Sequence, residues 1–206
     1  MRSAVLMKAD PATVERTAEC LANGGVVLLP TDTVYGLAVQ PTFGQAIQRV
    51  FSMKGRPRQV NLPIMVWSEG EIEALGFAVN EPARRLLRSP LIPGSLTLAL
   101  GFGEGPVPRW LEGREEAAVR IPDDGWLLSV LRRTGPLLVT SANVHGAGTP
   151  ENLGDVLAQL QGEPDLAVDG GALQTVPSTL VNCRRDPPVV ERIGAVPESE
   201  VMEYLK

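Results

Sequence analysis

The chain has 206 residues, of which 44% are hydrophobic, and this is enough material for one large domain whose core needs no disulfide. Its formal net charge of −5 argues against a nucleic-acid backbone as the main partner, although a local basic patch could still bind a nucleotide. Two isolated cysteines, a single histidine and no long apolar segment argue against a zinc site, a disulfide framework, a secretory signal and a membrane span, and predict a cytosolic protein.

The first quarter of the chain predicts a helix, a short strand and a second helix. Asp10 can cap a helix that begins at Pro11, and Gly24-Gly25 ends it. Residues 26–29 form a buried strand. The second helix has its apolar residues at Phe43, Ile47, Val50 and Phe51. It should end near Lys54 and Arg56, so that the two cations leave the helix together.

The rest of the chain alternates between strands and helices. Seven segments are bounded by Pro, Gly or Asp and have the length of strands: 62–66, 96–100, 117–121, 137–140, 166–168, 179–181 and 189–191. Three segments begin with a capping residue and carry one apolar face: 80–88, 124–133 and 149–160. This alternation predicts an α/β fold around one large twisted sheet, and the absence of a linker-like segment predicts a single domain over residues 1–206.

Three polar runs adjoin hydrophobic segments: residues 30–37 (PTDTVYGL), 54–57 (KGRP) and 140–143 (TSAN). Lys54 and Arg56 are two residues apart and would point the same way from an extended chain, so both could reach one triphosphate, with Arg58 extending the row. The alternative is a solvated basic turn at the end of a helix, where the helix dipole also favours cations, and the tripeptide alone favours this reading.

The other polar residues have equally open readings. Thr140, Ser141 and Asn143 follow a buried strand, where α/β proteins bind ligands, but they could also form a hydrogen-bonded turn. Thr31, Asp32, Thr33 and Tyr35 could grip a small amino acid, although a tight turn is favoured.

Arg120 lies inside an apolar strand and needs an anion, which a ligand or a buried acidic residue could supply equally well. Ser178 and Arg192 have no special meaning by themselves, and His145 reads first as a loop residue.

In their order and in their residues, these runs resemble the signature blocks of the YrdC family, the L-threonylcarbamoyl-AMP synthases. The resemblance continues through residues 93–97 (PGSLT), 118–122 (AVRIP), 169–171 (DGG), 178–179 (ST) and 192–194 (RIG). It implies an open, twisted mixed sheet with flanking helices and a concave ligand-binding face. It also implies a nucleotidyltransferase that makes threonylcarbamoyl-AMP and pyrophosphate from L-threonine, bicarbonate or carbon dioxide, and ATP with Mg²⁺. A downstream threonylcarbamoyl transferase would modify tRNA, and direct tRNA binding would be weak.

The resemblance also implies roles for single residues. Lys54 and Arg56 would be the catalytic cations. The ATP-binding set would be Lys54, Arg56, Arg58, Ser141, Asn143 and Arg192. The threonine-binding set would be Thr31, Tyr35, Arg120 and Ser178. Val60, Asn61, Ser95, His145 and Val176 depart from the usual pattern, and Val60 and Met65 leave the details of threonine and bicarbonate binding open.

No triad signature, phosphate loop or paired histidines occur, which argues against covalent catalysis and a protein-bound metal. Two other functions stay open: an RNA-binding module without catalysis, disfavoured by the acidic balance and the lack of an aromatic platform, and a same-fold enzyme that hydrolyses or transfers a carbamoyl adenylate. Because the chain ends soon after Arg192, the resemblance predicts the short form without a further C-terminal domain.

Overall fold

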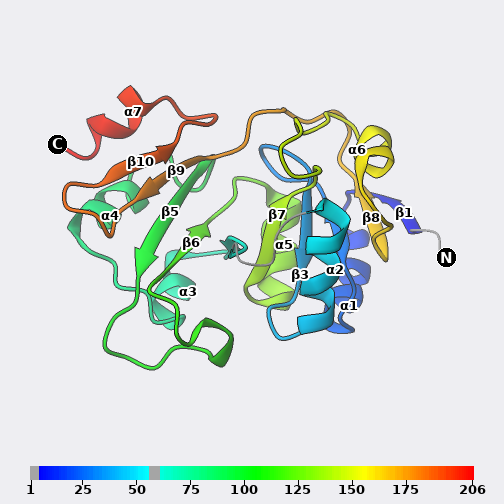
Figure 1. The fold of residues 1–206 in the computed structure, drawn as a ribbon, viewed down its shortest axis with the longest axis horizontal. Coiled ribbons are helices and arrows are strands. Elements are labelled where there is room, and N and C mark those ends of the chain that lie inside the picture. Colours follow the sequence, from blue (N-terminus) through cyan, green and yellow to red (C-terminus); the bar gives the residue numbers. More distant parts are fainter. Residues whose placement is uncertain (1–4, 56–60) are drawn as a thin grey trace.

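The computed structural model describes residues 5–55 and 61–206, and its strands form one mixed sheet in the order β1-β8-β2-β3-β7-β4-β6-β5-β9-β10 (Figure 1). The strands are β1 (Val5–Lys8), β2 (Val27–Leu29), β3 (Gly36–Val39), β4 (Ile64–Met65), β5 (Leu96–Gly101), β6 (Glu116–Arg120), β7 (Leu137–Ser141), β8 (Leu166–Asp169), β9 (Thr179–Asn182) and β10 (Val189–Arg192). The helices are α1 (Thr13–Ala22), α2 (Gly44–Lys54), α3 (Glu69–Ala74), α4 (Glu81–Leu87), α5 (Gly125–Thr134), α6 (Leu153–Gln159) and α7 (Glu198–Glu203), with a 3-10 turn at Arg109–Leu111. The predicted fold class, a twisted mixed sheet with flanking helices, is confirmed.

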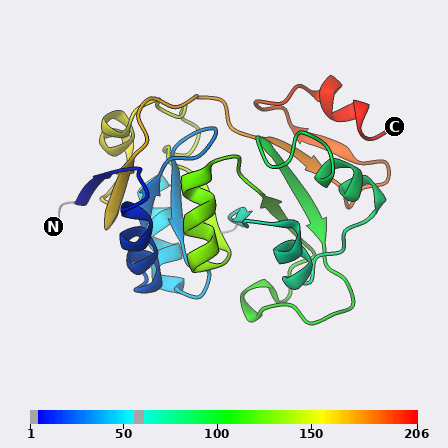
Figure 2. The same cartoon turned by 180° about the vertical axis from the view of Figure 1, so that it is seen from behind.

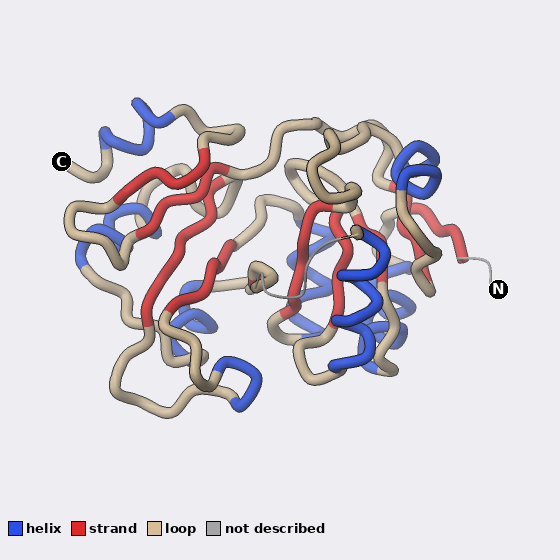
Figure 3. Tube along the Cα trace, in the orientation of Figure 1, coloured by secondary structure: helices blue, strands red, loops and turns tan. Residues whose placement is uncertain are grey.

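The two-residue strand β4 joins two groups of longer strands. It pairs antiparallel with β7 on one side and parallel with β6 on the other. Figure 3 shows the two groups as separate bundles of red tube, with the α1, α2, α5 and α6 helices beside one group and α3, α4 and α7 beside the other, as labelled in Figure 1. The sheet is therefore continuous only through a very short segment.

One face of the sheet is hydrophobic from β3 to β5. Directly opposite residues of neighbouring strands share a face, while successive residues of one strand alternate between faces, so Leu37, Leu138, Ile64, Val119 and Leu98 lie on the same face. These residues belong to the larger core cluster, which also contains buried residues of α2, α3, α4, α6 and α7. This face is the main source of hydrophobic burial in the fold.

The opposite face is covered in one part and lined by polar groups in another. Helices α1 and α5 supply the helical residues of the second core cluster, which packs on β2, β3, β7 and β8 (Figure 2). Met65 of β4 also belongs to this cluster. Beyond β4, the same face carries Thr97, Ala118, Arg120 and Leu180, and these residues line a cavity.

Side-chain caps explain several helix boundaries. The Asp10 carboxylate accepts hydrogen bonds from the backbone N–H of Ala12 (2.8 Å) and Thr13 (3.1 Å), as predicted, although α1 begins at Thr13 rather than at Pro11. Asn80 and Asp124 cap α4 and α5 in the same way. The start predicted at Thr149 was wrong, because Asn152 is the residue whose side chain accepts from a first-turn amide of α6, that of Asp155 (3.1 Å).

Sequence patterns missed or misplaced some elements. Strands β1 and β3 and the short helices α3 and α7 were not predicted. The strand predicted at 62–66 is reduced to Ile64–Met65, since Pro63 has no N–H to donate to a neighbouring strand. No helix in the described ranges is long and apolar enough to cross a membrane.

Candidate functional site

A cavity of about 270 Å³ lies over β4, where the two groups of strands meet. Its walls come from β3 and the turn before it, from β7, and from β4, β6, β5, β9 and β10. The polar lining residues are Thr31, Thr33, Asn61, Thr97, Arg120, Thr140, Ser141, Ser178 and Arg192. Segments far apart in the sequence thus converge on one hollow, among them the polar runs 30–37 and 140–143.

Five of the predicted site residues line this cavity: Thr31, Arg120, Ser141, Ser178 and Arg192. Lys54 and Asn143 lie directly behind Ser141 and are bonded to it. Tyr35 is placed elsewhere, as described below. The predictions for Arg56, Arg58 and Val60 concern positions outside the described residues.

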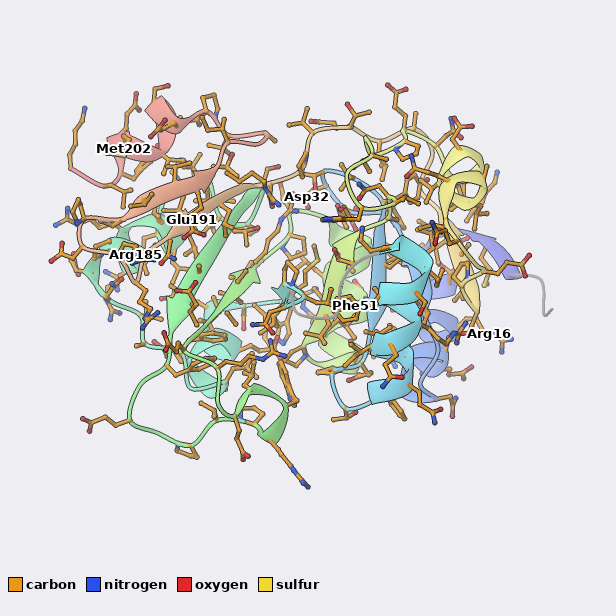
Figure 4. The ribbon with its side chains drawn as sticks, viewed as in Figure 1. Arg16, Asp32, Phe51, Arg185, Glu191 and Met202 are labelled. Atoms are coloured by element: carbon orange, nitrogen blue, oxygen red, sulfur yellow. The ribbon has the colours of Figure 1, made fainter. Side chains whose placement is uncertain are left out.

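Arg120 is held by three residues from two segments of the chain, the turn before β3 and the loop before β5. Its Nη2 donates to Oδ2 of Asp32 (2.8 Å), its Nη1 to Oγ1 of Thr33 (2.9 Å), and its Nε to the carbonyl of Gly94 (2.9 Å). Both side chains of the ion pair are buried, with 5% of Arg120 and 10% of Asp32 exposed, and Figure 4 labels Asp32 between the two groups of strands. Burial lowers the pKa of Arg120, and the adjacent Asp32 opposes that shift. The acidic partner left open by the sequence is therefore Asp32.

The arginine still has capacity for a ligand. A guanidinium has five N–H groups, and three of them make the bonds just described. Since Arg120 also lines the cavity, the two other N–H groups could donate to a carboxylate there.

Thr31 forms the tight turn that the sequence favoured. Its hydroxyl donates to the carbonyl of Val34 (2.7 Å) and accepts from the backbone N–H of Thr33 (3.1 Å) and Val34 (3.2 Å). The turn leads into β3 at Gly36, where a Cβ atom would lie 2.8 Å from Cγ1 of Val139. Glycine is required there by the close approach of β7, so the wall beside Thr31 is rigid.

Lys54 is the last residue of α2 and only 3% exposed. Its ammonium donates to the carbonyls of Ser141 and Asn143, the latter at 2.7 Å, and to Oδ1 of Asn143 (3.2 Å). The Ser141 hydroxyl donates to the same Oδ1 (2.6 Å). The predicted helix does end at Lys54, and Gly55 follows it in the left-handed region with φ 57°, so the chain is helical rather than extended at Lys54 itself. The lysine instead fixes the end of β7.

A linked group of polar side chains lies on the other side of the cavity. Arg192 donates through Nη2 to the carbonyl (2.7 Å) and hydroxyl (3.2 Å) of Ser178, and through Nε to the same carbonyl (3.1 Å). The Ser178 and Thr97 hydroxyl oxygens are 2.7 Å apart. Thr97 was not singled out by the sequence, although it lies in the PGSLT block and alternates with the buried Leu96 and Leu98.

Tyr35 does not line the cavity. Its side chain is fully buried, and its hydroxyl donates toward Oδ1 of Asp169 (3.2 Å) and the carbonyl of Gly171 (2.8 Å) and accepts from the N–H of Gly170 (3.0 Å). Burial, together with Asp169, raises its pKa to about 12. Its hydroxyl joins the start of β3 to the turn after β8, and the threonine-binding role stays a prediction.

The remaining sequence departures divide between the cavity and the surface. Asn61 lines the cavity, whereas His145 is exposed in the loop after β7 and Val176 is exposed beside Pro177. Among the described residues, no group of three or more His, Cys, Asp or Glu side chains could hold a metal ion.

Comparison with known proteins adds a family match. Residues 19–194 match the Sua5/YciO/YrdC family model, which is described as telomere recombination. A protein of Bacillus subtilis named threonylcarbamoyl-AMP synthase is 32% identical over 195 residues, covering 93% of this chain and 56% of that protein. The chain therefore spans little more than half the length of this relative.

Two solved structures have the same fold. Sua5 of Pyrococcus abyssi complexed with L-threonine has a TM-score of 0.85 and 31% identity, covering 98% of this chain and 60% of the other. Escherichia coli YciO has a TM-score of 0.84 and 26% identity, covering 98% of this chain and all of the other. The likeness extends over nearly all of the present sheet and its helices.

Proposed function

The chain belongs to the Sua5/YciO/YrdC family, and from this membership and the cavity we propose that it is a threonylcarbamoyl-AMP synthase. L-threonine captures carbon dioxide or bicarbonate as a carbamate, a carbamate oxygen attacks the α-phosphorus of ATP, and pyrophosphate leaves. The observation that carries the proposal is one cavity lined by Arg120 and Ser178 together with Ser141 and Arg192. The product would pass to a threonylcarbamoyl transferase that modifies tRNA, in the cytoplasm.

The amino acid is assigned to the part of the cavity around Arg120. The two spare N–H groups of the guanidinium suit a carboxylate, and Met65, Ala118 and Leu180 offer an apolar surface beside it. A solved relative of the same fold is complexed with L-threonine, which supports L-threonine as the amino acid. Arg120 and Ser178 are both buried, so the site would also shield a carbamate, which is short-lived in water.

The nucleotide is assigned to the part of the cavity around Ser141 and Arg192. The guanidinium of Arg192 and the hydroxyl of Ser141 both line the cavity, and the ammonium of Lys54 lies behind the end of β7. Transfer to the α-phosphorus is promoted mainly by alignment and by positive charge placed where negative charge grows. We assign that charge to Lys54 and Arg192, together with Arg56 and Arg58 from the sequence.

Mg²⁺ would enter the site bound to ATP, as part of the substrate. The described residues contain no carboxylate cluster that fits the ion, and Mg²⁺ commonly keeps its waters and binds through substrate phosphates. No step assigned to the protein depends on it.

The test is pyrophosphate release from ATP with L-threonine and bicarbonate, each omitted in turn. Release should require all three substrates. Arg192→Ala should raise KM for ATP by about tenfold or more, because it removes a cation from the cavity. The matched control is Arg184→Ala, since Arg184 is 46% exposed and pairs with Glu115 outside the cavity; it should change KM by less than about twofold.

Other results would redirect the assignment. Pyrophosphate release that ignores threonine would point to a same-fold enzyme acting on another carbamoyl compound. A salt-sensitive RNA mobility shift without ATP chemistry would point to an RNA-binding module.

A further inference from the structure

Arg120, Thr97 and Leu180 form a row across three adjacent strands on the cavity face. In the antiparallel register of β5 and β6, Leu98 is opposite Val119, so the next residues, Thr97 and Arg120, both lie on the other face of the sheet. Thr97 is also paired with Leu180 of β9. Adjacent strands are about 4.8 Å apart, so Thr97 lies one strand spacing from the arginine assigned to the substrate carboxylate.

Thr97 shares its hydroxyl hydrogen bond with Ser178, which lies two residues before Leu180. The two oxygens are 2.7 Å apart, and Ser178 also accepts from Nη2 of Arg192. Two hydroxyl groups carry two hydrogens, and their mutual bond uses only one. Within the described ranges neither hydroxyl has a further acceptor, so the pair retains one hydrogen to donate.

This remaining hydrogen is shielded from solvent and adjoins the cavity. Thr97 is 4% exposed and Ser178 is 5% exposed, and both line the cavity. A buried donor without an acceptor is unfavourable. A ligand oxygen at this point would accept its hydrogen bond and so gain binding free energy that an apolar group could not.

A small β-hydroxy amino acid matches this spacing. With its carboxylate on Arg120, its side-chain oxygen can reach the neighbouring strand, while its methyl group faces Met65, Ala118 or Leu180. We propose that Thr97, acting with Ser178, donates a hydrogen bond to the side-chain hydroxyl of the amino-acid substrate; this inference rests on the proposed function. Thr97 is then the residue that selects threonine over valine, which has the same shape but no hydroxyl.

The experiment compares kcat/KM for L-threonine and L-valine in the full chain. Thr97→Val removes the hydroxyl while keeping the shape, and it should lower the threonine-to-valine ratio by about tenfold or more, with KM for ATP changed less than about twofold. Thr97→Ser keeps the hydroxyl and should retain most of the ratio. Thr17→Val is the matched control, because Thr17 is a fully buried threonine of α1 outside the cavity.

Calorimetric binding of both amino acids gives a second readout, and Ser178→Ala gives a second variant if Thr97→Val does not fold. An unchanged ratio in the folded variant would overturn the inference, as would a rise in KM for ATP alone, which would mean that the pair only positions Arg192. If the wild type binds and turns over threonine and Thr97→Val keeps the threonine-to-valine ratio of kcat/KM, only the role of Thr97 is refuted. A wild-type protein that neither binds nor uses threonine refutes the proposed function as well.

Discussion

Replacing Asp32 with alanine should destabilise the protein strongly, because it leaves a buried cation without its counterion. Arg120 is 5% exposed, and its contact with Asp32 is 2.8 Å. Removing one partner of a buried ion pair costs about 3–5 kcal/mol, since the remaining charge stays desolvated. For a chain of this size such a loss lowers Tm by about 6–20 °C, at roughly 2–4 °C for each kcal/mol.

Urea denaturation followed by circular dichroism measures this loss directly. With a slope of about 2–3 kcal/mol per molar urea, the midpoint should fall by about 1–2.5 M. Glu15→Ala is the matched control, because the Glu15–Arg133 pair has a similar contact distance, 2.5 Å, but more than half of each side chain is exposed. Exposed pairs contribute about 0–1 kcal/mol.

The double variant Asp32→Ala/Arg120→Leu tests the cause. Removing both charges should cost less than the sum of the two single changes, because no unpaired buried ion is left. If Asp32→Ala and Glu15→Ala lower the free energy of unfolding by similar amounts, the reasoning about burial is refuted.

Three further changes test other parts of the site. Burial raises the pKa of Tyr35 to about 12, so its contribution to stability is complete below pH 10 and is lost toward pH 12. The free energy of unfolding of the wild type should therefore fall by about 1.4 kcal/mol per pH unit in that range, and Tyr35→Phe should abolish this fall, as measured by urea denaturation. Gly194→Ala would place a Cβ 2.2 Å from the carbonyl oxygen of Pro177, so it should displace Arg192 and raise KM for ATP by about tenfold, and an unchanged KM would contradict this. Lys54→Met should lower stability by about 1–3 kcal/mol as well as activity, because buried carbonyls lose their donor, and a thermal melt equal to wild type would argue against that role.

Periodicity predicted the main elements well where a segment has one clear face. The helix ending near Lys54 and the strands carrying Thr97, Arg120 and Ser141 were found because buried residues recur at helical spacing or form short apolar runs. Strand β3 was missed because its first two residues, Gly36 and Leu37, were taken as part of the polar run 30–37. The five cavity residues were predicted from the order of several motifs along the chain and not from any single motif.

The partners of individual side chains could not be predicted. The Arg120–Asp32 pair joins residues 88 positions apart, and the sequence alone left a ligand and a protein carboxylate equally open. Tyr35 was grouped with the ligand-binding threonines because it is adjacent in sequence, whereas its ring enters the core and its hydroxyl contacts residues more than 130 positions away. The Thr97–Ser178 contact depends on the pairing of β5 with β9, which no local pattern encodes.

Successive residues of β6 alternate between the hydrophobic face and the cavity face of the sheet. Ala117 and Val119 belong to the larger core, while Ala118 and Arg120 line the cavity. A saturation mutagenesis library of this strand should therefore show two interleaved tolerance profiles, one tracking side-chain volume and the other tracking substrate turnover. Of the two cavity-facing positions, Arg120 should follow both profiles, because its ion pair with Asp32 is buried.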